Sequence, residues 1–86
     1  MTSYIAFKDS NERDAAWLAE AVEFTATVCV MGEVITHRAT TQAEAVEAAR
    51  QMEATLAAQQ IDKKVLIYAV TAKGHSTMVP RKTWNV

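Results

Sequence analysis

The sequence predicts a small α+β domain: a mostly antiparallel sheet, in the element order β-α-β-β-α-β-β, with a helix over residues 41–59 packed on one of its faces. Three observations lead to this fold class. Residues 41–59 combine a helix-start signal with a narrow apolar stripe. Residues 24–30 alternate between apolar and polar side chains, and residues 65–70 are apolar at almost every position. Strand-like segments therefore lie on both sides of the helix, and its stripe is expected to cover the sheet.

The first two elements come from short patterns. Residues 4–7 are apolar with aromatic ends, which predicts a strand. Asp9 and Glu12 then have the spacing of a capping box, and a helix is expected over residues 11–21. The predicted apolar stripe of that helix consists of Ala15, Leu18, Ala19 and Val22.

Residues 24–30 and 33–39 predict a hairpin. A type II′ turn at Gly32 and Glu33 would pair Val30 with Ile35 and Val28 with His37. Because strand side chains alternate between faces, Phe24 and its even-numbered neighbours should face the helix. The opposite face then holds Thr25, Thr27, Cys29, Val34, Thr36 and Arg38.

The helix over residues 41–59 has the clearest signal in the chain. The Thr41 hydroxyl can accept from the N–H of Glu44, and the Glu44 carboxylate can reach back to the N–H of Thr41. The predicted stripe that faces the sheet is Ala45, Ala49, Met52 and Leu56.

The C-terminal third predicts two further strands. The apolar run 65–70 is typical of a central strand with both faces at least partly covered, and the helix should connect it to strand 33–39 by a crossover between parallel strands. A three-residue loop ending at Gly74 leads into strand 75–79, which Pro80 ends or confines to a sheet edge.

Size and composition set limits on the protein. Its 86 residues form one domain, and half are hydrophobic, many of them alanine. The core is therefore thin, or a partner such as a second copy adds to it. Cys29 is the only cysteine, no secretory leader is apparent and no apolar run could span a bilayer, so we expect a soluble cytoplasmic protein.

The residues that could carry chemistry favour structural roles. Cys29 and His37 are the one nucleophile–base pair to consider, but the alternation places them on opposite faces of the sheet. Two histidines and one cysteine do not suggest a metal site, and no glycine-rich phosphate loop is present. We therefore expect no cofactor and no enzymatic activity.

Two binding functions remain. The first is a protein-binding module, monomeric or homodimeric, that uses the sheet face of Thr25, Thr27, Val34, Thr36 and Arg38. The second is a small nucleic-acid-binding accessory protein. Residues 61–86 carry a net charge of +4 against −5 for residues 1–60. The candidate phosphate and base contacts are Lys73, Arg81, Lys82 and Trp84, unless Trp84 folds back over the sheet.

The order of elements from residue 24 to residue 79 carries a resemblance. It rests on residues 25–30, Gly32, Ala39, residues 43–52 and residues 65–70. In size and layout the chain resembles small phage- and plasmid-encoded αβ inhibitor proteins, including certain type I anti-CRISPR proteins. The resemblance implies a compact domain that blocks a host protein complex by binding to its surface, without chemistry. It carries over no functional residue, because these proteins share no signature motif with this chain.

Overall fold

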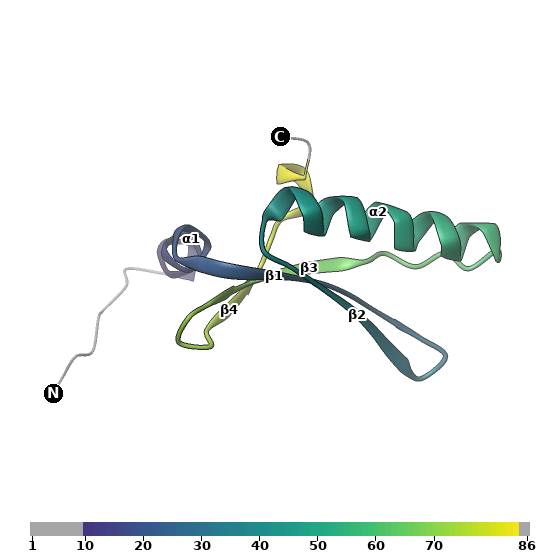
Figure 1. The fold of residues 1–86 in the computed structure, drawn as a ribbon, viewed down its shortest axis with the longest axis horizontal. Coiled ribbons are helices and arrows are strands. Elements are labelled where there is room, and N and C mark those ends of the chain that lie inside the picture. The colour runs from purple at the N-terminus through teal and green to yellow at the C-terminus, as the bar shows by residue number, and fades with distance from the viewer. Residues whose placement is uncertain (1–9, 85–86) are drawn as a thin grey trace, which may run out of the picture.

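A computed structural model describes residues 10–84 of the chain, and its elements form one sheet with helices packed on it (Figure 1). The four strands lie in the order β2-β1-β3-β4, and every neighbouring pair is antiparallel. The α+β class and the packing of the long helix on the sheet are thereby confirmed, while the strand predicted over residues 4–7 lies outside the described residues. The elements are α1 (Ser10–Ala19), β1 (Ala21–Val30), β2 (Glu33–Ala39), α2 (Gln42–Ala58), β3 (Leu66–Thr71), β4 (Ser76–Met78) and the 3-10 helix η1 (Arg81–Thr83).

The β1–β2 hairpin turns one residue earlier than the sequence predicts. Met31 and Gly32 form the turn with φ of 52° and 82°, so both central residues are left-handed, as in a type I′ turn. Val30 consequently pairs with Glu33 and Val28 with Ile35, and the predicted register is wrong by two residues. A slip of two keeps every side chain on its predicted face, because strand side chains alternate with a period of two.

Helix α2 begins as predicted. Thr41 is the N-cap and its hydroxyl accepts from the N–H of Glu44 at 3.2 Å. The Glu44 carboxylate accepts from the hydroxyls of Thr40 at 3.0 Å and Thr41 at 3.2 Å. These hydrogen bonds hold the pKa of Glu44 below its usual value. Four helix residues are buried, namely Ala45, Val46, Ala49 and Leu56, with Met52 half-buried beside them.

Helix α2 is capped at its C-terminal end without a glycine. Gln60 takes the left-handed conformation at φ 61°. Its N–H donates to the carbonyl of Ala57 at 2.9 Å, and the N–H of Ile61 donates to the carbonyl of Leu56 at 2.9 Å. These two bonds define a Schellman motif. Ile61 packs against the core cluster that contains Leu56, which supplies the apolar contact that accompanies the motif.

Strand β3 is an inner strand whose two faces are covered to different extents, with Tyr68 and Val70 half-buried on the face away from α2. It pairs with β1 and β4 on either side. It runs in the same direction as β2, as the crossover prediction requires, although β1 lies between the two. Ile67 and Ala69 are fully buried beneath α2, whereas Leu66 on the other face is 41% exposed. The expectation that both faces are at least partly covered holds for Tyr68 and Val70, and Leu66 is the most exposed residue of the strand.

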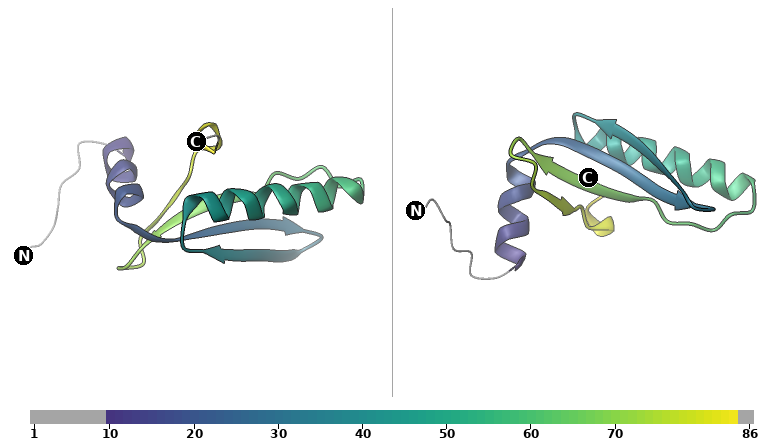
Figure 2. Two further views of the ribbon diagram at one scale, coloured as in Figure 1. Left: turned by 45° about the horizontal axis from the view of Figure 1, so that its top comes forward. Right: turned by 90° about the horizontal axis from the view of Figure 1, so that it is seen from below.

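Helix α1 is shorter than predicted and uses different contacts. It ends at Ala19, and Val22 of the predicted stripe instead belongs to β1 and is exposed. Leu18 packs against the core cluster. The Trp17 ring stacks on the His75 imidazole with their centroids 4.8 Å apart, which fastens α1 to the start of β4. Figure 2 shows α1 at the end of the sheet where β1 begins.

The core between α2 and the sheet is built largely from small side chains. Its cluster includes Ala26, Ala45, Ala49 and Ala69. Ile67 and Val65 are the largest side chains that are fully buried among the described residues. Within residues 10–84 no helix combines the length and the apolar character needed to cross a lipid bilayer.

Candidate protein-binding surface

The sheet face turned away from α2, here called the open face, is a continuous surface contributed by all four strands. The right-hand view of Figure 2 looks at the sheet from the side opposite α2. Its exposed apolar residues come from three different strands: Val34 is 68% exposed, Leu66 41% and Met78 49%. The open face consists of Thr25, Thr27, Cys29, Val34, Thr36, Arg38, Leu66, Tyr68, Val70, Ser76 and Met78.

Hydroxyl and charged groups stand between the apolar side chains of the open face. The Thr27 and Thr36 hydroxyl oxygens lie 3.4 Å apart across the β1–β2 pair. The Arg38 guanidinium lies 3.6 Å from a carboxylate oxygen of Glu23. Both contacts are exposed, so they order the surface without contributing much stability.

The structure gathers the predicted partner-binding residues and adds others. Thr25, Thr27, Val34, Thr36 and Arg38 all lie on the open face as their alternation predicts. Leu66, Tyr68, Val70, Ser76 and Met78 join them through the β1–β3 and β3–β4 registers. Sequence reasoning missed this second half, because a nearly unbroken apolar run gives no alternation from which to assign faces.

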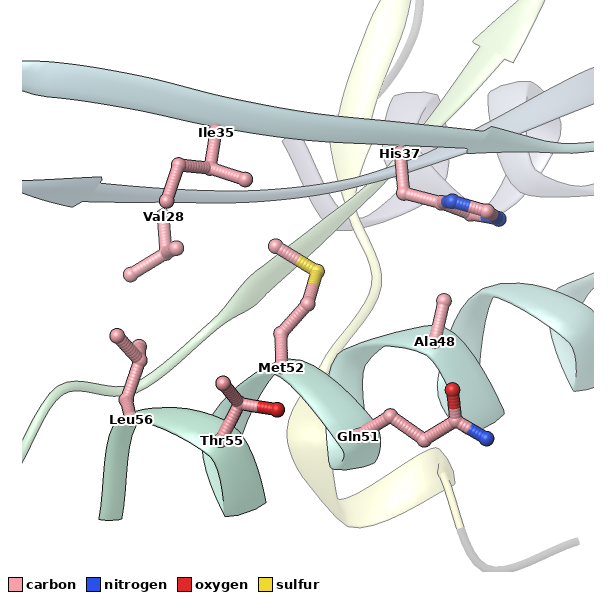
Figure 3. Close-up of a pocket in the computed structure, with 8 residues that line it drawn as sticks. All are labelled: Val28, Ile35, His37, Ala48, Gln51, Met52, Thr55 and Leu56. Carbon is pink, nitrogen blue, oxygen red and sulfur yellow. The ribbon is translucent and has the colours of Figure 1, made fainter. Parts of the chain in front are cut away.

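A groove separates β2 from α2 on the covered side of the sheet. Its volume is about 320 Å³, and Figure 3 shows Met52 pointing from the helix toward the strands. Apolar side chains dominate the lining, with the polar groups of His37, Gln51 and Thr55 among them. The lining residues are Val28, Ile35, His37, Ala48, Gln51, Met52, Thr55 and Leu56. The groove therefore lies between the edge strand β2 and the side of α2 that faces it.

The predicted nucleic-acid residues are not brought together as one surface. Lys73 lies in the turn before β4, and Arg81 and Lys82 lie in η1 after it (Figure 1). The Trp84 side chain is only 5% exposed, so it offers no free ring face to a base. Trp84 instead packs beneath the Arg81 guanidinium, which lies 4.3 Å from its ring. The sequence alternative in which Trp84 folds back onto the domain matches this burial.

Arg81 itself is engaged in a small structural network. It donates to both carboxylate oxygens of Glu53, at 2.9 and 2.5 Å. The same carboxylate accepts from the backbone N–H of Val65 at 2.8 Å. The hydrogen bonds from Arg81 lower the pKa of Glu53 against the opposing effect of burial, and Glu53 in turn raises the pKa of Arg81. This network joins α2, the segment before β3 and the C-terminal turn.

The nucleophile–base pair considered from the sequence is not assembled. Cys29 is exposed on the open face, whereas His37 lines the groove on the other side of the sheet. Among the residues that the structure describes, no three histidine, cysteine or acidic side chains gather in a way that could hold a metal ion. Three candidate binding surfaces remain on the described part of the chain. They are the open face, the groove, and the free edge of β2, which pairs only with β1 in the described sheet.

Comparisons with protein-family models, with curated proteins and with solved structures find no match for this chain.

Proposed function

We propose that this protein is a non-enzymatic protein-binding module whose contact surface is the open face of the sheet. The observation that carries the proposal is the exposure of Val34, Leu66 and Met78 on one side of a single sheet. Exposed apolar side chains that gather on one surface, with polar groups between them, are typical of protein–protein contact sites. A sheet is also a rigid support, so such a surface needs little reordering on binding.

The mode of action that fits this surface is steric. The open face is extended and broad, whereas a substrate site is usually concave and encloses its ligand. A module of this kind acts on a partner by occupying part of the partner's surface. The resemblance to phage- and plasmid-encoded inhibitors stays a prediction from the order of the elements.

A capture experiment with a charged variant tests the proposal. Thr27 lies near the centre of the open face, on β1 between β2 and β3, and its side chain is half-buried. In Thr27→Glu a carboxylate is added to the middle of the contact surface, where it would lose its hydration on binding. The tagged wild-type chain is used to capture its partner from a lysate of the source organism. We expect this partner to be lost with Thr27→Glu, because its affinity for the variant is lower by about a hundredfold.

Ala54→Glu is the matched control for this capture. It also adds one negative charge, but at an exposed position of α2, on the opposite side of the sheet and outside the groove. Circular dichroism of both variants establishes that the fold is retained. Capture that survives Thr27→Glu, or that is lost equally with Ala54→Glu, would exclude the open face as the binding surface.

Nucleic-acid binding through Lys73, Arg81, Lys82 and Trp84 stays a prediction from the sequence. It requires an available tryptophan ring and unpaired cations. The burial of Trp84 and the ion pair between Arg81 and Glu53 favour the protein-binding proposal instead.

A further inference from the structure

We infer that β2 is a self-association edge: two copies of this chain join their β2 strands antiparallel about a two-fold axis at Thr36, so that their two four-stranded sheets become one. This inference goes beyond the proposed function and does not depend on it, because the part of the open face that holds Leu66 and Met78 stays accessible in such a dimer, although the second copy covers Val34. The contact surface is the free edge of β2 together with the groove between β2 and α2.

The two edges of the sheet differ in how they are protected. β4 has three residues and is followed by Pro80, which cannot donate to a further strand. β2 has seven residues, paired without a bulge, and contains neither lysine nor proline; its charged residues, Glu33 and Arg38, lie near its two ends. Sheet edges that must stay unpaired are usually short, bulged or marked by such residues. β2 therefore has the character of an edge that pairs with another strand.

The hairpin register decides which backbone groups of β2 point outward. A two-residue turn makes Val30 and Glu33 a hydrogen-bonded pair, so alternate residues of β2 from Glu33 onward bond to β1. Val34, Thr36 and Arg38 then direct their N–H and C=O groups to the free edge. Pairing Thr36 with the second copy's Thr36, and Val34 with the second copy's Arg38, forms about six new backbone hydrogen bonds.

The side chains of β2 are complementary to themselves in this register. On the groove side, Ile35 lies beside the second copy's Ile35 and His37 beside its Glu33, since diagonal neighbours across two strands are within reach of long side chains. In each of the two His37–Glu33 contacts, the imidazole is a hydrogen-bond donor or a cation and the Glu33 carboxylate is the acceptor. On the open face the Arg38 stem covers the second copy's Val34, which is 68% exposed in the single chain. No like charges stand directly opposite each other.

The spacing of the two α2 helices in the dimer also favours a second copy of the chain, rather than a lone peptide strand, as the partner of β2. α2 packs against β1, β2 and β3, so it lies over the middle strand of the three. In the dimer three strand spacings separate the two β1 strands, which places the two α2 axes about 14 Å apart. Directly packed helices lie about 8–10 Å apart. The remaining space suits a layer of side chains, and Ile35, Gln51 and Thr55 of both grooves lie there.

The mass of the 86-residue chain, measured by sedimentation equilibrium over a range of concentrations, tests this inference. We expect the wild type to reach twice the 9.5 kDa chain mass at tens of micromolar. In Thr36→Glu the two carboxylates face each other on the axis, so the dimer dissociation constant should rise at least about tenfold. Ser76→Glu adds the same charge on the same sheet face at the opposite edge and should leave the constant unchanged.

A disulfide trap then fixes the register. In a Cys29→Ser background, Thr36→Cys brings two cysteines together on the axis with Cα atoms about 5.5 Å apart, within the range that a disulfide spans. We expect a covalent dimer to accumulate in a glutathione redox buffer, and Ser76→Cys in the same background to stay single-chain.

Two results would overturn the inference: a wild type that stays at the single-chain mass throughout, or a dimer that Thr36→Glu leaves intact and Thr36→Cys does not trap. The latter would place the contact elsewhere on the chain. Thr27→Glu should remain dimeric, because Thr27 lies inside the sheet. The failure of this inference and the failure of the proposed function are thus seen separately.

Discussion

At the scale of single residues, one carboxylate connects three parts of the chain. Glu53 accepts from the Arg81 guanidinium and from the backbone N–H of Val65, which follows the loop after α2. Its side chain is only 19% exposed, so these bonds are largely shielded from water. Removing the carboxylate charge weakens the Arg81 pair and leaves the Val65 N–H with a poorer acceptor.

We expect Glu53→Gln to lower the free energy of unfolding by about 1–2 kcal/mol at neutral pH, measured by chemical denaturation. The pKa of Glu53 is below its usual value of 4.5 in the folded protein, so the unfolded chain binds more protons between the two values. The contribution of Glu53 is therefore complete above its unfolded pKa and is lost as the pH falls through its lowered folded pKa.

The difference in stability between wild type and Glu53→Gln should accordingly shrink in acid. Glu47→Gln, at an exposed position of the same helix, provides the control and should change stability by less than about 0.5 kcal/mol. A Glu53→Gln difference that is equally large in acid and at neutral pH would show that the charge of Glu53 does not stabilise the fold.

At the scale of elements, the end of α2 holds a residue in an unfavourable conformation. Gln60 occupies the left-handed position of the Schellman motif, where glycine has no steric penalty. We expect Gln60→Gly to raise the free energy of unfolding by about 0.5–1 kcal/mol, measured by chemical denaturation. Gln59→Gly, one residue earlier at φ −95°, should not stabilise the protein. Equal effects of the two substitutions would contradict the left-handed cap.

How far the sequence predicts these elements depends on the kind of signal that each one carries. The start of α2 and its buried stripe follow from Thr41, Glu44 and the spacing of the alanines, which are local and periodic. The hairpin register does not, because Met31 adopts a positive φ that its side chain gives no reason to expect. The end of α1 was also missed, since neither glycine nor proline separates it from β1.

The candidate site was predicted in part for a similar reason. Alternation in β1 and β2 assigns Thr25, Thr27, Val34, Thr36 and Arg38 to one face in every register that differs from the predicted one by an even number of residues, as the observed register does. The contribution of β3 and β4 to that face depends on how the strands are ordered, which side-chain periodicity does not encode. The groove beside β2 likewise depends on the distance between α2 and the edge strand, a tertiary property.

At the scale of the whole molecule, the sheet has one face covered by α2 and one accessible face, and the proposed binding surface requires this difference. Cys29 and Val28 are adjacent on β1 and point to opposite sides. Cys29 is exposed on the open face, whereas Val28 is buried toward α2. These two positions therefore report on the two faces of the same strand.

The reaction rate of a thiol at these positions with a disulfide reagent, in the folded protein, is the most direct test. We predict that Cys29 reacts within about tenfold of its rate in the denatured chain. A cysteine introduced by Val28→Cys in a Cys29→Ser background should be slower by about a thousandfold, because it reacts only after local opening. A Cys29 thiol protected as strongly as the one at position 28 would contradict the open face, and with it the proposed binding surface.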